Sequence, residues 1–263
     1  MIPLFTVDSF TSKAFAGNPA AVCFPPGPKP DAWLHDVARE MNLSETAFLW
    51  SEGDGFRLRW LTPTVEVDLC GHATLASAHI LWQTGRLKPD AQARFQSRSG
   101  LLTATKKGEW MELNFPAKPP EEAAPPPQLL DALGTKAQWV GSNRMDYFAL
   151  VESEEEVRRL RPDFAALKGV SARGIIVTAR SADSDFDFVS RFFAPGSGID
   201  EDPVTGSAHC CLAPFWGQRL GKRNMVGFQA SARGGVVRVT TEGDRVILGG
   251  QAVTILEGML RLT

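Results

Sequence analysis

The sequence has no hydrophobic run of about 18 residues, which is the length that a membrane-spanning helix needs. It also has no run of five basic residues, and its 28 Lys and Arg nearly balance its 30 Asp and Glu, for a formal net charge of -2. Nucleic acids and anionic membrane surfaces are bound through concentrated positive charge. We therefore expect no nucleic acid and no membrane as a partner.

Cysteine is scarce and shows no metal-binding pattern. The four cysteines, at positions 23, 70, 210 and 211, form no C-x-x-C pair of the kind found in zinc sites. No charged, apolar and cleavable leader precedes the first strand-like run. We therefore expect a cytoplasmic protein with reduced thiols and no metal site.

The length and composition are typical of a globular protein with one or two domains. Hydrophobic residues make up 43% of the 263 residues and charged residues 22%, close to globular averages. The proline-rich segment PAKPPEEAAPPPQ, at 116–128, lacks hydrophobic periodicity and is typical of a linker. We predict an N-terminal lobe over 1–117, a linker over 118–127 and a C-terminal lobe over 128–263, with the alternative that the last strand returns to the first lobe.

The two predicted lobes resemble each other in sequence. CGHA at 70–73 and TGSA at 205–208 are 135 residues apart, and the same offset relates Gly100 to Gly235. A period of this length indicates a duplicated domain, because stacked repeats have much shorter periods.

Each lobe has the pattern of a sheet around one helix. Strand-like segments at 56–60 and 186–190 precede alanine- and leucine-rich helical segments at 73–84 and 208–220, each followed by a glycine. Two hairpin patterns, LLTATKKGEWMEL and VVRVTTEGDRVIL, come next. The sequence predicts an α+β fold of two pseudo-symmetric lobes, each a curved, mostly antiparallel sheet around a central helix.

The glycine loops before the two helices are the first candidate sites. Gly71 and Gly206 let backbone N–H groups approach a ligand, and the positive end of a helix favours an anion. A simple helix cap is the alternative. The pairing of the two loops predicts that a small anionic metabolite binds between the helix N-termini, in a cleft between the lobes.

Cys70 and His72 flank the first of these glycines. A thiol at a helix N-terminus has a lowered pKa, but the residue that matches Cys70 in the second lobe is Thr205, which cannot act as a thiolate base. Two-thiol chemistry is therefore disfavoured. His72, at the positive end of the helix, is expected to be neutral and to bind substrate or transfer a proton, with a solvated loop histidine as the alternative.

Two carboxylates near these loops have open roles. Glu45 lies at a turn between buried residues, where an exposed glutamate is the usual interpretation. Asp202 precedes Pro203 just before the second helix, where it either caps the helix or orients a polar group of the substrate.

Four segments of the chain, in this order, carry a family resemblance: VDSFTSKAFAGNPAAV, AREMNLSETAF, RWLTPTVEVDLCGHATLASA and RFFAPGSGIDEDPVTGSAH. They resemble the PhzF-like family, named for the phenazine-biosynthesis isomerase. The resemblance covers both lobes and implies the diaminopimelate-epimerase-like fold and a homodimer. It implies that Glu45, His72 and Asp202 are catalytic. It also implies that Ser207 binds substrate, and from the glycine loops we expect Gly71 and Gly206 to bind it as well.

By this resemblance the protein is a cofactor-independent isomerase in which Glu45 takes a proton from the substrate and returns it on the same face. Such a role requires a Glu45 pKa of about 6 or 7, which burial beside Phe48 would provide. A cysteine-based amino-acid epimerase and a non-catalytic protein that binds a metabolite or a partner are the alternatives. The substrate is left open.

Overall fold

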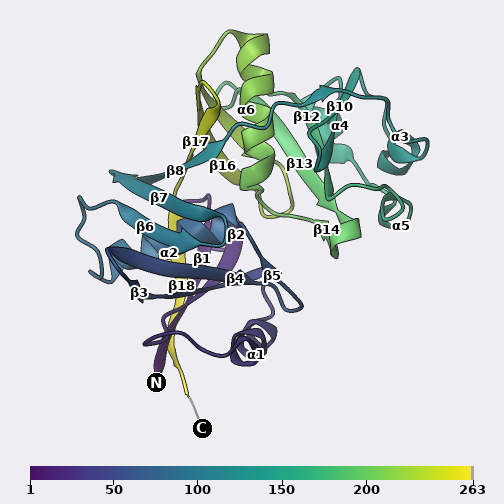
Figure 1. The fold of residues 1–263 in the computed structure, drawn as a ribbon. Coiled ribbons are helices and arrows are strands. Elements are labelled where there is room, and N and C mark those ends of the chain that lie inside the picture. The colour runs from purple at the N-terminus through teal and green to yellow at the C-terminus, as the bar shows by residue number, and fades with distance from the viewer. Residues whose placement is uncertain (262–263) are drawn as a thin grey trace. The chain divides into compact units, whose positions relative to one another are not determined.

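A computed structural model describes residues 1–261 of the chain (Figure 1). The chain forms two compact units. Unit 1 consists of Met1–Asn114 together with the C-terminal segment from Gly249, and unit 2 is Phe115–Leu248. Within residues 1–261, every helix is too short or too polar to cross a membrane.

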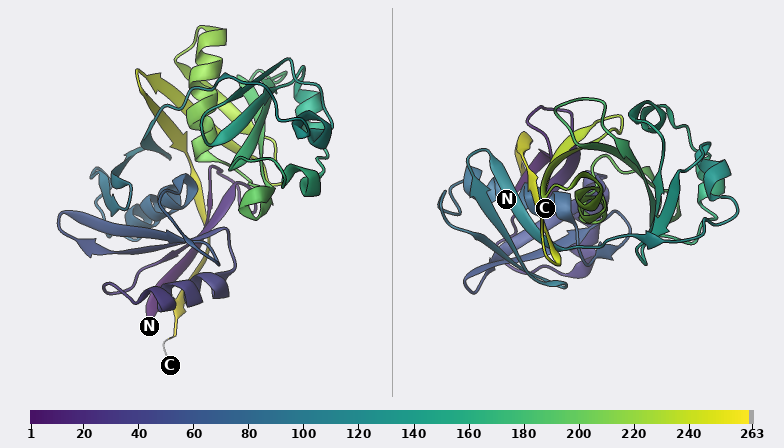
Figure 2. Two further views of the ribbon diagram at one scale, coloured as in Figure 1. Left: turned by 45° about the vertical axis from the view of Figure 1, so that its right-hand side comes forward. Right: turned by 90° about the horizontal axis from the view of Figure 1, so that it is seen from above.

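These units divide the chain differently from the lobes expected from the sequence. The segment 118–127 lies within unit 2, where β9 (Glu121–Glu122) pairs with β10 (Trp139–Ser142), because a proline-rich chain is extended and can still join a sheet edge. The C-terminal segment belongs to unit 1, because β18 (Ala252–Leu260) pairs antiparallel with β1 (Ile2–Ser9) along its length. The two strands lie side by side in both views of Figure 2.

Unit 1 is a mostly antiparallel sheet with one buried helix. The pairs β1–β2, β3–β4, β6–β7 and β7–β8 are antiparallel, whereas β2–β3 and β4–β6 are parallel. The helix α2 carries no Asp, Glu, Lys or Arg and packs against β1, β2 and β3, as expected of a helix that is buried along most of its length. The elements are β2 (Asn18–Cys23), α1 (Asp31–Met41), β3 (Glu45–Glu52), β4 (Gly55–Leu61), β5 (Glu66–Val67), α2 (Gly71–Gln83), β6 (Ala93–Ser97), β7 (Gly100–Lys107) and β8 (Trp110–Pro116).

Unit 2 repeats the same order of strand pairings. Here β10–β11, β12–β13 and β15–β16 are antiparallel, and β11–β12 and β13–β15 are parallel. This match agrees with the duplication inferred from the 135-residue offset. The elements are α3 (Leu129–Leu133), β11 (Asp146–Leu150), α4 (Glu154–Arg159), α5 (Phe164–Leu167), β12 (Gly174–Arg180), β13 (Phe188–Ala194), a 3₁₀ turn (Pro195–Ser197), β14 (Ile199–Glu201), α6 (Gly206–Leu220), β15 (Asn224–Gln229), β16 (Gly235–Glu242) and β17 (Arg245–Gly250).

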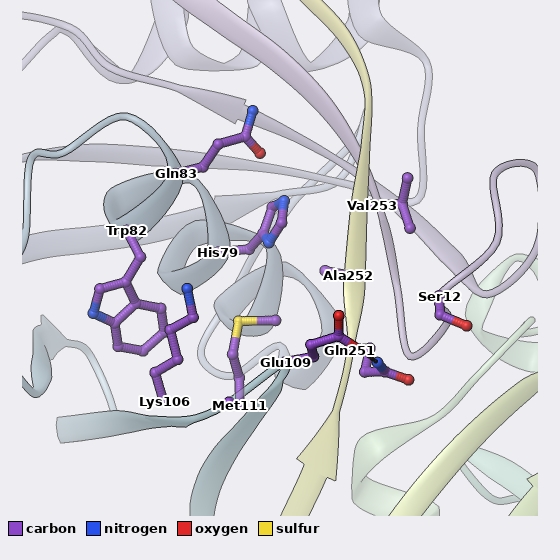
Figure 3. Close-up of a pocket in the computed structure, with 11 residues that line it drawn as sticks. Ser12, His79, Trp82, Gln83, Lys106, Glu109, Met111, Gln251, Ala252 and Val253 are labelled. Atoms are coloured by element: carbon purple, nitrogen blue, oxygen red, sulfur yellow. Dashed lines mark hydrogen bonds between the residues drawn. The ribbon is translucent and has the colours of Figure 1, made fainter. Parts of the chain in front are cut away.

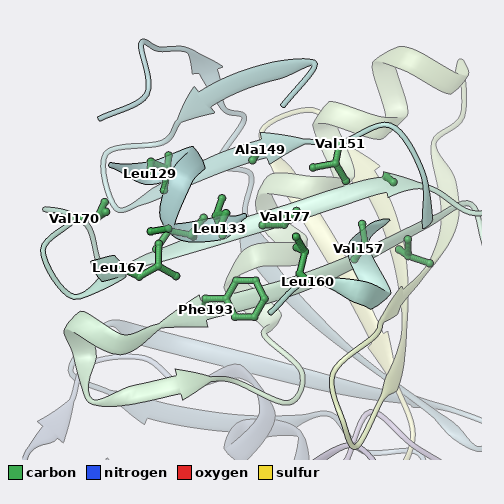
Figure 4. Close-up of a cluster of buried hydrophobic side chains, with 14 residues drawn as sticks. Leu129, Leu133, Ala149, Val151, Val157, Leu160, Leu167, Val170, Val177 and Phe193 are labelled. Carbon is green, nitrogen blue, oxygen red and sulfur yellow. The ribbon is translucent and has the colours of Figure 1, made fainter. Parts of the chain in front are cut away.

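A buried cluster of aliphatic side chains and Phe193 holds α3, α4 and α5 against the strands of unit 2 (Figure 4). Leu129, Leu133, Val157 and Leu167 come from the helices, and each is almost fully buried. Since burying one such side chain contributes roughly 1.5–3 kcal/mol, these short helices are stabilised by packing rather than by their own hydrogen bonds.

The same partly buried ion pair occurs once in each unit. Arg59 binds both carboxylate oxygens of Glu66, at 2.8 and 2.6 Å, and Arg191 binds both oxygens of Glu201, at 2.7 and 2.8 Å. In each unit the pair connects a central strand to the loop that leads into the buried helix. The repeat therefore extends to the side chains that position the two candidate loops.

The elements predicted from the sequence are largely those of the structure. The helices α2 and α6 each begin two residues before the predicted start, and the two predicted hairpins are β7–β8 and β16–β17. Gly221 ends α6 in the left-handed conformation, at φ 64°. The second predicted strand begins at Phe188 instead of Phe186. The predicted α+β fold is confirmed.

Candidate active site

Glu45 and His72 meet inside unit 1 at the beginnings of β3 and α2. The helix α1 ends at Asn42 in the left-handed conformation, and the chain then enters β3 at Glu45. The carboxylate Oε2 of Glu45 lies 3.2 Å from Nε2 of His72, and only 14% and 7% of these two side chains are exposed. The structure therefore brings the two predicted catalytic residues of the first lobe into a buried ion pair.

Three side chains from two of the motif segments hold His72 in place. Ser9 Oγ donates a 2.8 Å hydrogen bond to the carbonyl oxygen of His72. Asn18 Nδ2 lies 3.2 Å from His72 Nδ1, and Ser44 Oγ lies 3.4 Å from Nε2. Both ring nitrogens thus lie close to polar side chains. We did not assign a role to Ser9, Asn18 or Ser44 from the sequence, although their motifs carried the resemblance.

The loop before Asn18 has a backbone that requires glycine. Gly17 has φ +67°, and a Cβ atom there would lie 2.2 Å from the carbonyl oxygen of Ser9. The buried carboxylate of Asp8 accepts a 2.7 Å hydrogen bond from the backbone N–H of Phe15 in the same loop. These contacts position Asn18 at the start of β2, and through Asn18 they position the His72 ring.

The charge states of Glu45 and His72 differ from those expected from the sequence. Burial raises the pKa of the Glu45 carboxyl, but the positive charge of His72 outweighs burial, and the pKa falls below its ordinary value of 4.5. Burial lowers the pKa of His72, but hydrogen bonding to Cys70 and Glu45 and the negative charge of Glu45 outweigh burial and raise the pKa well above 6.5. The predictions of a raised Glu45 pKa and of a neutral His72 were wrong, because each treated one residue without its partner.

Cys70 completes the cluster as a protonated thiol. Its Sγ lies 3.5 Å from His72 Nδ1. Burial and the negative charge of Glu45 raise the pKa of this thiol, which outweighs the favourable contribution of His72. The prediction that the helix N-terminus lowers this pKa was therefore wrong, because a buried thiolate beside a carboxylate is unfavourable.

The other cysteines behave as apolar core residues, as predicted. Cys23 lies in β2, and Cys210 and Cys211 lie in α6; all three are buried free thiols. Burial raises the pKa of Cys23 and of Cys210 to about 12. These thiols stay protonated and unreactive at neutral pH.

In unit 2, Asp202 lies in a hydrogen-bonded network at the N-terminus of α6. The hydroxyl of Thr205 donates to the Asp202 carboxylate, and the backbone N–H of Thr205 donates to Gln229 Oε1 at 2.8 Å. Gln229 Nε2 donates to the carbonyl oxygen of Asp202 at 2.7 Å. Gln229 is completely buried at the end of β15. Sequence reasoning missed Gln229, and its only signal was a polar residue ending a largely apolar strand.

The predicted substrate-binding residues lie at the first turns of the two buried helices. Gly71 begins α2, and Gly206 and Ser207 begin α6. Gly206 is buried, whereas Ser207 is partly exposed. Unit 1 thus assembles Glu45 with the α2 turn, and unit 2 assembles Asp202 with the α6 turn. The cleft between the lobes stays a prediction.

Unit 1 also has a hollow of about 400 Å³ that includes none of the predicted site residues (Figure 3). Its wall includes His79, Trp82, Lys106, Glu109 and Gln251. Burial lowers the pKa of His79. Its mixed charges do not favour a ligand of one sign, so the hollow is a weaker candidate site than the Glu45 cluster.

The chain is similar in sequence and in fold to proteins of one family. The PhzC-PhzF family model, described as "Phenazine biosynthesis-like protein", matches residues 7–258. An uncharacterized isomerase of Halalkalibacterium halodurans is 51% identical over 99% of this chain and 98% of its own length. The crystal structure of a PhzF-family protein from Enterococcus faecalis is 43% identical, covers 99% of both chains and has a TM-score of 0.95. A predicted epimerase from Pseudomonas aeruginosa, 20% identical over the whole of both chains, has a TM-score of 0.77 and therefore shares the fold.

Proposed function

Since the chain belongs to the PhzC-PhzF family of phenazine biosynthesis-like proteins, we propose that it is a cofactor-independent isomerase acting on a small anionic carboxylate or amino-acid-like metabolite. The name isomerase, carried by a relative that is 51% identical, supports the reaction class. The observation that carries the proposal is the buried ion pair of Glu45 and His72. This pair places a proton acceptor beside a cation in a site with little access to water.

The low pKa of Glu45 fits proton abstraction once the substrate is bound. Without substrate, the carboxylate is ionised and weakly basic at neutral pH. An anionic substrate adds negative charge and removes water, and both effects raise the pKa of a nearby carboxyl group. Binding of the substrate therefore strengthens the base when the base is needed.

The proposed reaction moves one proton within the substrate and leaves the enzyme unchanged. Glu45 takes a proton from one carbon and becomes neutral, while the electron pair of the broken C–H bond is delocalised within the substrate. The positive charge of His72 stabilises the negative charge that develops there. Glu45 then returns the proton to another carbon on the same face, so the substrate is isomerised and the enzyme is restored.

The residues at the two helix N-termini complete the proposal as substrate-binding groups. Gly71, Gly206 and Ser207 would bind the substrate carboxylate through backbone N–H groups and the serine hydroxyl, and Asp202 would orient the substrate for proton transfer. A homodimer is also part of the proposal, and light scattering on the purified protein measures it.

Hydrogen exchange in D₂O tests the role of Glu45. Wild type and Glu45→Gln are incubated with cyclic and acyclic amino acids and small carboxylates, and deuterium at carbon is followed by NMR. We expect exchange and turnover to fall by roughly 10²–10⁴-fold in Glu45→Gln, the usual contribution of a general acid–base group. The exposed control Glu40→Gln should retain both. Equal exchange in wild type and Glu45→Gln would refute the proposed base.

One observation favours a cysteine-based epimerase as a second candidate, namely the 3.5 Å separation of Cys70 Sγ and His72 Nδ1. The raised pKa of Cys70 and the threonine at the matching position 205 weigh against it. Exchange that is lost in Cys70→Ser but retained in Glu45→Gln would support the epimerase. A metabolite that binds without any exchange in wild type would support the non-catalytic role.

A further inference from the structure

Three side chains with different donor atoms converge beside α2. A carboxylate oxygen of Glu45, Sγ of Cys70 and a ring nitrogen of His72 all lie within 4.8 Å of one another. The spacing of the cysteines and histidines predicted no metal site, because Glu45 comes from a strand 25 residues before Cys70. The fold brings together a donor set that the sequence spacing does not reveal.

The distances within the cluster suit a tetrahedral metal ion. With Zn–S of about 2.3 Å and Zn–N of about 2.0 Å, sulfur and nitrogen ligands on one zinc ion are about 3.5 Å apart. Cys70 Sγ and His72 Nδ1 are 3.5 Å apart. The Glu45 oxygen Oε2 lies 3.2 Å from the other ring nitrogen, Nε2, so it would leave that contact and turn toward the Nδ1 edge of the ring to reach the same zinc ion. Zinc on Nδ1 would replace its contact with Asn18 Nδ2.

One carboxylate oxygen of Glu45, Oε2, lacks a well-aligned hydrogen-bond donor among residues 1–261. This oxygen is buried and lies 3.2 Å from His72 Nε2. A buried carboxylate oxygen without such a bond costs free energy, and coordination by a cation would offset this cost. This observation is independent of the cysteine and histidine spacing.

From this geometry we propose that Glu45, Cys70 and His72 form a binding site for Zn²⁺, with water as the fourth ligand. Mixed sulfur, nitrogen and oxygen donors favour zinc over Mg²⁺ and Ca²⁺, which prefer oxygen donors. Binding displaces the thiol proton of Cys70 and the Nδ1 proton of the His72 cation to solvent, and Zn–S and Zn–N bonds form without any change of oxidation state. Bound zinc would occupy Glu45 and His72 and thereby inhibit the enzyme; this consequence alone rests on the proposed function.

Cobalt spectroscopy tests the site without an activity assay. Purified full-length protein is titrated with Co²⁺, and the near-ultraviolet thiolate-to-cobalt charge-transfer band is recorded. Zn²⁺ affinity is measured by competition with a chromophoric chelator. We expect a saturable band for wild type that added Zn²⁺ abolishes. We expect no band, and Zn²⁺ affinity at least tenfold weaker, in Cys70→Ser. The control Cys23→Ala removes a buried thiol of the same unit and should behave as wild type.

A second variant keeps the test decisive if Cys70→Ser does not fold. In Glu45→Gln the thiolate band should remain, but Zn²⁺ affinity should fall at least tenfold, because one anionic ligand is lost. Absence of the band in wild type would overturn the proposal, and so would unchanged Zn²⁺ affinity in the folded variants. Because these readouts need no substrate, they stand even if the proposed isomerase activity fails.

Discussion

The charge on Glu45 should control the protonation of His72, and Glu45→Gln removes that charge with little change in shape. In wild type, Cys70 and Glu45 outweigh burial and raise the pKa of His72. When the carboxylate becomes an amide, burial remains and the negative charge beside Nε2 is lost. The pKa of His72 should therefore fall, and the ring should be neutral at a pH at which wild type is charged.

The size of this effect follows from the separation of the charges. Opposite unit charges 3.2 Å apart, the distance between Glu45 Oε2 and His72 Nε2, interact by about 5 kcal/mol at an effective dielectric constant of 20 and by about 1 kcal/mol in bulk water. Because the pair is largely buried, the upper part of this range applies. Since about 1.4 kcal/mol corresponds to one pH unit, the midpoint should fall by more than one pH unit in Glu45→Gln.

Side-chain NMR of the histidines measures this directly and needs no substrate. The chain has four histidines, so the His72 signal is assigned by its loss in His72→Asn. Glu40→Gln, at an exposed position of α1, should leave the His72 midpoint unchanged. A wild-type His72 midpoint at or below pH 6.5, or the same His72 midpoint in Glu45→Gln and wild type, would show that the ion pair with Glu45 does not keep His72 protonated.

Three further predictions concern the framework around the site. Burial lowers the pKa of His209 to about 4, whereas the unfolded chain binds this proton near pH 6.5. The free energy of unfolding should therefore fall by up to about 3 kcal/mol between pH 6.5 and 4. Urea unfolding should show a smaller loss of stability over this pH range in His209→Asn than in wild type. In Gly17→Ala, the alanine must adopt a positive φ and its Cβ clashes with the backbone of Ser9, so this variant should be destabilised by about 2 kcal/mol or more. In the control Gly27→Ala, the added Cβ points into open space. Its stability in thermal unfolding should stay within about 0.5 kcal/mol of wild type. Arg191→Lys keeps the charge but loses the two-pronged contact with Glu201 and should cost about 2 kcal/mol by urea unfolding; full stability would contradict a structural role for this pair.

Sequence patterns predicted the family, the α+β fold and both buried helices, because these depend on local signals. Gly221 ends a helix through its own backbone conformation, and the helix α2 is recognised by its alanine- and leucine-rich composition. The family predicted from four motif segments is confirmed by the match over residues 7–258. The extent of the first unit was less predictable, because the pairing of β18 with β1 joins residues more than 240 positions apart.

The errors in the predicted charge states share a physical cause that bears on mechanism. A lone buried glutamate has a raised pKa, and a lone histidine at a helix N-terminus is neutral; in contact, each stabilises the charged form of the other. A base so strongly paired is weak until something competes for its partner. In the proposed reaction, the carboxylate of an anionic substrate would be such a competitor, since it would interact with the His72 cation and repel Glu45. Substrate charge, rather than burial alone, would then determine when Glu45 becomes basic enough to take a proton from carbon.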